Sequence, residues 1–196
     1  MFYLLYSKTG EQIDSMFLPH DAVADYNFDM KSFFYNDSGL FFVRPFDNTV
    51  YALRNNRITP IYEIILPNPL PIRKIEEKMR HIELPNSGYS YGIGDVYMAG
   101  NKLHLTYTKD GFVVSTFFDL STNNFLYNGI RVLGEARENL PIYSLINGVY
   151  RGKFFALVSA SSIVEARGNH PGYFSGNLLK IKEDDNDVLA FFSFRN

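Results

Sequence analysis

Short runs of aromatic and β-branched residues, separated by turn residues, make up most of the chain. The first two runs, 2–7 and 12–18, flank Lys8-Thr9-Gly10, where the glycine suits a tight hairpin turn. Four more runs follow, each joined to the next by a short turn, at residues 32–35, 40–44, 49–53 and 58–66. This pattern predicts a four-stranded antiparallel meander.

The same unit then recurs twice along the chain. The second copy has its runs at 91–98, 102–108, 112–120 and 125–132, and the third at 143–150, 153–159 and 188–194. The pairs Phe34-Tyr35, Val96-Tyr97 and Val149-Tyr150 each precede a turn and an apolar second strand. Self-similar four-stranded units are typical of propeller blades. A generic β-sandwich, which also consists of short strands, is the alternative.

The sequence therefore predicts an all-β fold, a partial β-propeller of about three four-stranded antiparallel blades with short helical insertions on one face. We expect one propeller-like domain over residues 1–196. Its parts are a partial blade at 1–30, a blade at 31–66, an insertion at 67–90, a blade at 91–133, and a blade at 143–196 that contains an insertion at 160–187. The strand count begins inside a blade and ends one strand short, which predicts a fragment or an unusual assembly.

Two segments interrupt the strand pattern. Prolines open the first, which continues as a predicted amphipathic helix at 72–80. The second holds predicted helices at 161–167 and around 176–182. In a meander these two connections leave the sheets at the same end. We therefore expect both insertions on one face, where loops on a rigid scaffold commonly bind partners.

Composition excludes several function classes. The net charge is −2 without a long basic run, so no electrostatic footprint for nucleic acid is present. The absence of cysteine excludes disulfides, thiolate zinc sites and cysteine nucleophiles. No stretch reaches the roughly 18 consecutive apolar residues of a membrane helix. The N-terminal ten residues are too short and polar for a signal peptide, so the chain as written is expected to be soluble and without an export signal.

Two motifs carry a family resemblance. The segment 44–51 (RPFDNTVY), followed by 59–62 (TPIY), resembles the TolB-like six-bladed β-propeller proteins of gut anaerobic bacteria. Residues 183–189 resemble their closing segment, with Asp187 in place of a proline. The resemblance spans essentially the whole chain but only the later half of a typical member. It implies an exported bacterial protein with a periplasmic or cell-surface location, and it assigns no catalytic role to these motifs.

Several residues are candidate ligand contacts. Tyr89, Tyr91 and Tyr97 would lie near the tunnel mouth, where a flat apolar ring with a hydroxyl suits sugars and peptides, although packing between blades is the alternative. Arg44 lies in a motif whose Asp and Asn can instead cap a turn. His170 lies in the loop of the second insertion, and it is a further candidate ligand contact.

Three further sets of residues bear on possible chemistry. His104, which alternates with leucines, is interpreted as a surface or satisfied core group rather than a ligand. Propeller enzymes hold calcium in the tunnel with oxygen ligands, and Asp95 and Asn147 are weak candidates for such a site, with Asp29 and Asn139 in the feeding loops. Ser159-Ala160-Ser161-Ser162 lacks the Gly-x-Ser-x-Gly elbow and is interpreted as a helix N-cap.

These observations favour a non-enzymatic binding or interaction module without a cofactor. Its partner would be a protein, a peptide or a carbohydrate, and not nucleic acid. The alternative function is a metal-dependent hydrolase or lyase with calcium in the tunnel. An open arc of blades would also expose faces rich in Phe and Tyr at its ends, so we expect self-association, with two arcs meeting in a ring-like dimer.

Overall fold

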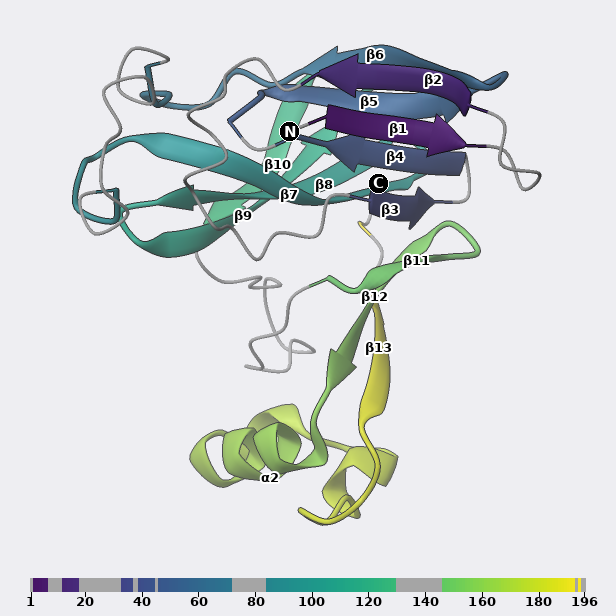
Figure 1. The fold of residues 1–196 in the computed structure, drawn as a ribbon. Coiled ribbons are helices and arrows are strands. Elements are labelled where there is room, and N and C mark those ends of the chain that lie inside the picture. The colour runs from purple at the N-terminus through teal and green to yellow at the C-terminus, as the bar shows by residue number, and fades with distance from the viewer. Residues whose placement is uncertain are drawn as a thin grey trace.

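Antiparallel sheets follow one another along the chain in the computed structural model, which describes residues 2–6, 12–17, 33–36, 39–44, 46–71, 84–129, 146–192 and 194. Within each sheet of these residues, neighbouring strands are consecutive along the chain, so every sheet is a simple meander (Figure 1). The first sheet contains β1 (Phe2–Tyr6) and β2 (Gln12–Phe17). The predicted helix at 72–80 lies outside the described residues.

Three larger sheets follow, of four, four and three strands among the described residues. The second sheet contains β3 (Phe33–Asn36), β4 (Gly39–Val43), β5 (Thr49–Arg54) and β6 (Arg57–Glu63). The third contains β7 (Ser90–Ala99), β8 (Lys102–Lys109), β9 (Phe112–Asp119) and β10 (Asn124–Gly129). The fourth contains β11 (Gly148–Tyr150), β12 (Lys153–Val158) and β13 (Val188–Phe192).

The first strands of these three sheets converge. β3, β7 and β11 contact one another, and the later strands of each sheet extend away from this centre. This radial arrangement is that of propeller blades, and it confirms the predicted partial β-propeller over the generic β-sandwich. The sheets form an open arc.

The β7–β10 sheet lies in the middle of the main hydrophobic core. On one face, the Tyr62 hydroxyl of β6 lies 3.6 Å from the sulfur of Met98. On the other face, the ring of Phe117 makes an edge contact with Phe154 of β12 at 5.3 Å. The core cluster therefore joins three sheets, and side chains on both faces of the β7–β10 sheet are buried.

A helical insertion separates β12 from β13. It contains α2 (Ala160–Asn169) and two 3₁₀ turns, η3 (Pro171–Tyr173) and η4 (Gly176–Leu179), and it extends away from the sheets at the far end of β12 and β13 (Figure 1). The predicted N-cap is confirmed, because the Ser159 hydroxyl accepts a hydrogen bond from the Ser162 backbone at 3.2 Å. No helix of the described residues is long and apolar enough to cross a membrane.

The prediction of a second helix around 176–182 is wrong in its extent. The structure forms only the short turn η4 there, followed by a turn at residue 180 and irregular chain. Gly176, the first residue of η4, has a φ of 58°, so a right-handed α-helix does not begin at this residue. The insertion has a small hydrophobic core of its own, which contains Val158, Ile163, Ala166 and Phe174.

Candidate functional site

The β5–β6 hairpin carries an open hollow of about 610 Å³. Asn55 and Asn56 form its two-residue turn with φ of 49° and 58°, values that asparagine tolerates better than most residues. This tight turn sets Arg54 opposite Arg57 in the strand register. The hollow is lined by Arg54, Asn55, Arg57, Thr59, Pro60 and Ile61.

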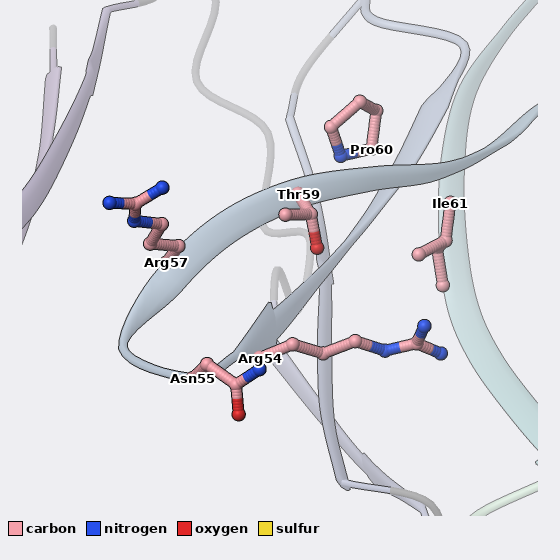
Figure 2. Close-up of a pocket in the computed structure, with 6 residues that line it drawn as sticks. All are labelled: Arg54, Asn55, Arg57, Thr59, Pro60 and Ile61. Atoms are coloured by element: carbon pink, nitrogen blue, oxygen red, sulfur yellow. The ribbon is translucent and has the colours of Figure 1, made fainter.

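Two arginines supply the charged groups among the residues that line this hollow. Their guanidinium groups lie at opposite ends of it, that of Arg54 passing beneath Thr59 toward Ile61 (Figure 2). Both side chains are exposed, and neither has an ion pair or hydrogen bond with any described residue. The lining contains no acidic side chain among the described residues. Among the described residues the lining thus carries two positive charges, each in a planar guanidinium fork that suits a negatively charged ligand.

Thr59 and Ile61 supply the floor between the arginines. The Thr59 hydroxyl donates to the backbone oxygen of Ala52 at 3.2 Å, which fixes its position and leaves its oxygen able to accept. Ile61 is half-buried and packs against the main core. The floor is thus held by the same packing that forms the blade.

Arg44, a predicted ligand contact, belongs to the turn that precedes β5. Its guanidinium pairs with Asp47 and donates to the Tyr51 hydroxyl at 2.6 Å, and that hydroxyl donates to Asp47 at 2.9 Å. The other Asp47 oxygen accepts from the Thr49 backbone at 2.9 Å. Burial, together with the Asp47 hydrogen bond, raises the pKa of Tyr51. The interpretation of this motif as a turn-forming one accounts for every one of these contacts.

The predicted tyrosines are mostly interior. Tyr97 is 2% exposed, with Phe34 at its edge, and Tyr91 is 6% exposed, with its ring 6.3 Å from Phe46. Burial raises the pKa of Tyr91. Tyr89 is half-buried, and its backbone donates to the Ser87 hydroxyl at 3.2 Å. Packing between blades, the alternative from the sequence, therefore describes Tyr91 and Tyr97.

The weak metal candidates each have an internal hydrogen bond. Asp95 accepts from the Thr106 hydroxyl at 3.4 Å, and the Asn147 side-chain oxygen accepts from the Leu157 backbone at 2.7 Å. Within the described residues, no three His, Cys, Asp or Glu side chains gather in a way that could hold a metal ion. Asp29 and Asn139 lie outside the described residues.

His170 lies at the C-terminal end of α2. Its backbone donates to the Ala166 oxygen at 2.8 Å, and its ring makes an edge contact with Tyr173 at 6.0 Å. The side chain is exposed. His170 is therefore accessible, but it belongs to the insertion, whereas the arginines belong to the β5–β6 hairpin.

Comparison with known proteins identifies the family. The model of a family named DUF5128 and described as a 6-bladed beta-propeller matches residues 1–138. The chain belongs to this family. Its structure is also similar to that of a "putative exported protein" from Bacteroides fragilis, with a TM-score of 0.69 and 17% sequence identity. That alignment covers 98% of this chain and 57% of the other. No curated protein matches the chain.

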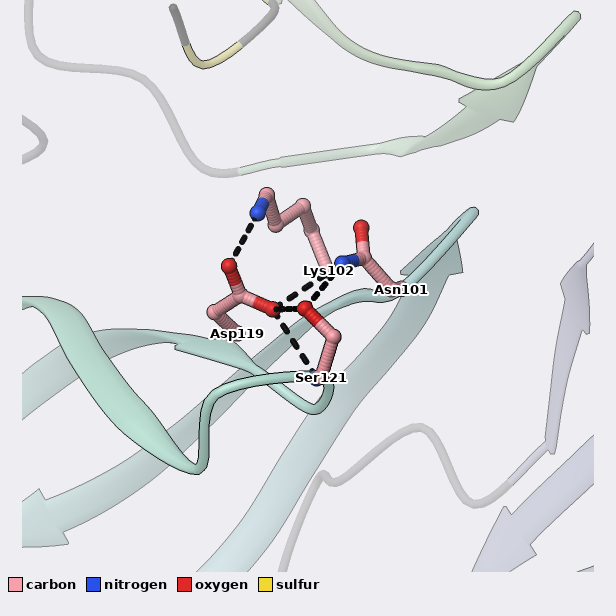
Figure 3. Close-up of polar contacts among 4 residues, drawn as sticks. All are labelled: Asn101, Lys102, Asp119 and Ser121. Carbon is pink, nitrogen blue, oxygen red and sulfur yellow. Dashed lines mark hydrogen bonds and ion pairs between the residues drawn. The ribbon is translucent and has the colours of Figure 1, made fainter. Parts of the chain in front are cut away.

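Sequence reasoning missed one polar cluster of this propeller, at the turn end of the β7–β10 sheet (Figure 3). Asp119 pairs with Lys102 and accepts from Asn101 at 3.0 Å and from the Ser121 hydroxyl and backbone at 2.5 and 2.9 Å. The hydrogen bonds from Lys102 and Ser121 hold the pKa of Asp119 well below its usual range. The cluster ties the β7–β8 turn to the β9–β10 turn, so we interpret it as structural. Its sequence signal is Asp-x-Ser at a strand end.

The hollow was also missed, although its signal is present. The sequence Arg-Asn-Asn-Arg at 54–57 predicts a two-residue turn, and such a turn places the flanking residues opposite each other. In the strand pattern this segment is only a turn between two strands. The concave shape of the hairpin surface depends on strand twist, which the sequence does not display.

Proposed function

We propose that this propeller is a non-enzymatic binding module of an exported bacterial protein and that the β5–β6 hollow takes a ligand bearing several carboxylates. The observation that carries the proposal is the pair Arg54 and Arg57, two exposed guanidinium groups at opposite ends of one hollow. Neither has an ion pair or hydrogen bond with a residue that the structure describes. Guanidinium matches carboxylate in charge and in planar geometry, and it forms paired hydrogen bonds with it.

The shape of the site favours an extended ligand. A small molecule is usually enclosed on most sides, whereas this hollow is open along the hairpin. A chain with regularly placed carboxylates can contact Arg54 and Arg57 together, with Pro60 and Ile61 against its apolar parts. Acidic polysaccharides and acidic peptides share this chemistry, and the binding experiment below separates them.

Export and the TolB-like assignment belong to the same proposal. The motifs at 44–51 and 59–62 support the TolB-like group, and the name of the Bacteroides fragilis neighbour supports export to the periplasm or cell surface. Fractionation of the native cells, with an antibody against the chain, tests this part. Signal in the cytoplasmic fraction alone would contradict it.

The binding experiment is calorimetric titration with oligogalacturonate, oligoglutamate and a neutral oligosaccharide. We expect one acidic probe to bind and the neutral one not to, with affinity falling as salt is raised. Arg54→Ala and Arg57→Ala should each weaken binding by about fivefold, the range of an exposed ion pair. Lys180→Ala, an exposed cation on the insertion, is the control and should leave binding unchanged.

Three outcomes bear on the site and its chemistry. Arg54→Lys keeps the charge but loses the planar fork, so a partial loss of affinity supports paired hydrogen bonds rather than charge alone. The site would be refuted if neither acidic probe binds, or if an acidic probe binds and neither arginine variant weakens its binding. Release of shorter oligomers from a bound probe would instead support the hydrolase or lyase alternative.

A further inference from the structure

The β11–β13 sheet has an apolar face that the described residues leave uncovered. Its register sets Phe155 opposite Phe191 and Leu157 opposite Leu189, and the Tyr150 ring lies 6.4 Å from that of Phe191. We call these five residues the outer face. Leu157 is 50% exposed, Leu189 53% and Phe191 49%.

The opposite face of the same strands is apolar and is covered by a neighbouring sheet. Phe154, Ala156 and Val158 alternate with the outer-face residues and are buried. The Phe154 ring packs against Phe117 of the β7–β10 sheet. Strands with one solvated face usually alternate apolar and polar residues, whereas strands covered on both faces are apolar throughout. The composition of β12 and β13 is therefore that of a sheet covered on both faces.

Opposite charges flank the outer face at its two ends. Arg151 and Lys153 are exposed at the β11–β12 turn. At the other end of these strands Val158 pairs with Val188, and Asp187 directly precedes β13. The exposed segment 182–187 carries Glu183, Asp184, Asp185 and Asp187 against the single cation Lys182, so this end is acidic. A basic end, an apolar centre and an acidic end thus follow one another along a single sheet.

We propose that the outer face docks against the same face of a second copy of this chain. A two-fold axis that crosses the strands between the Phe155–Phe191 and Leu157–Leu189 pairs would lay the apolar centres together. It would also bring the basic end of each copy beside the acidic end of the other. This order of charges is self-complementary under such a rotation. The proposal does not depend on the arginine hollow, which lies on another sheet.

Sedimentation velocity over a micromolar concentration range tests the docking. We expect the wild-type chain to form a dimer that dissociates on dilution. Leu157→Glu would place a charge in the centre of the interface, so it should leave only monomer. Leu179→Glu is the control, since Leu179 is 53% exposed on η4, and it should stay dimeric. Circular dichroism melts verify that both variants fold.

A charge exchange tests the two-fold geometry itself. Lys153→Glu and Asp187→Lys should each weaken the dimer several-fold by placing like charges together, and the double variant should restore it. The two residues lie at opposite ends of one sheet, so a pairing within one chain does not explain such a rescue. A wild-type chain that is monomeric throughout, a dimer in Leu157→Glu, or a double variant without rescue would each overturn the proposal.

Discussion

His104 accepts a hydrogen bond from Ser115, whose hydroxyl oxygen lies 2.9 Å from the ring nitrogen Nε2. The direction of this bond follows from the other side of the ring. Nδ1 lies 3.0 Å from the backbone oxygen of Asp95, which can only accept, so Nδ1 carries the proton. His104 is fully buried, with the Phe117 ring 4.5 Å away. The centre of the β7–β10 sheet is thus built around a neutral histidine with both nitrogens satisfied.

This histidine makes the stability of the propeller depend on pH. Burial lowers the pKa of His104 from 6.5 to about 3. The unfolded chain takes up this proton below about pH 6.5 while the folded chain excludes it, so stability falls as pH drops through that window. The slope is roughly 1.4 kcal/mol per pH unit. In urea unfolding, wild type should lose more stability than His104→Gln between pH 7 and pH 5. Equal losses would contradict the assignment.

Removal of the Ser115 hydroxyl, the hydrogen-bond donor to His104, should lower the free energy of unfolding at neutral pH. Ser115→Ala leaves Nε2 of His104 buried without a donor, and such a group costs about 1–3 kcal/mol. Ser175→Ala is the matched control because Ser175 is exposed and its side chain makes no capping hydrogen bond. Urea unfolding at pH 7 compares the two variants. A Ser115→Ala protein as stable as the control would show that the hydrogen bond contributes nothing.

The helical insertion should loosen independently of the sheets. Arg167 on α2 donates to the backbone oxygens of Leu178 and Leu179 at 3.0 and 2.9 Å, and these bonds tie the helix to η4. Arg167→Ala should therefore raise amide hydrogen exchange in the insertion by about tenfold while the β7–β10 sheet keeps its protection. Glu165→Ala, an exposed change on the same helix, should leave both unchanged. Faster exchange in the sheet would show that insertion and sheet unfold together.

Local pattern was enough to predict the blades. The run at 112–120 became Phe112–Asp119, and the run at 153–159 became Lys153–Val158, because turn residues and alternating aromatic residues act within a few positions. β11 spans Gly148–Tyr150, whereas the predicted run began at 143. Residues 146 and 147 are irregular, and residues 143–145 lie outside the described residues.

Burial and concavity could not be predicted in the same way. Alternation of His104 with Leu103 and Leu105 suggests that one face is buried, but a blade between two neighbours buries both, and all three residues are interior. Which sheets neighbour one another depends on contacts between segments distant in sequence. The apolar outer face shows the converse, because Leu157 and Leu189 look like core residues in sequence and are half exposed in the structure.

Substitution of two glycines by alanine should have opposite effects on stability, because a side chain meets a steric clash at Gly148 but favours the helix at Gly168. A Cβ at Gly148 would lie 2.7 Å from the Phe155 ring, so Gly148→Ala must displace that ring and should destabilise the propeller by about 1–3 kcal/mol. Gly168, inside α2, has open space around its Cβ position, and Gly168→Ala should stabilise the helix by about 0.5–1 kcal/mol. Thermal unfolding and hydrogen exchange within 160–169 measure the two effects. If both substitutions changed the free energy of unfolding equally, Phe155 would move aside at no cost. The close contact between Gly148 and Phe155 would then not contribute to the pairing of β11 with β12.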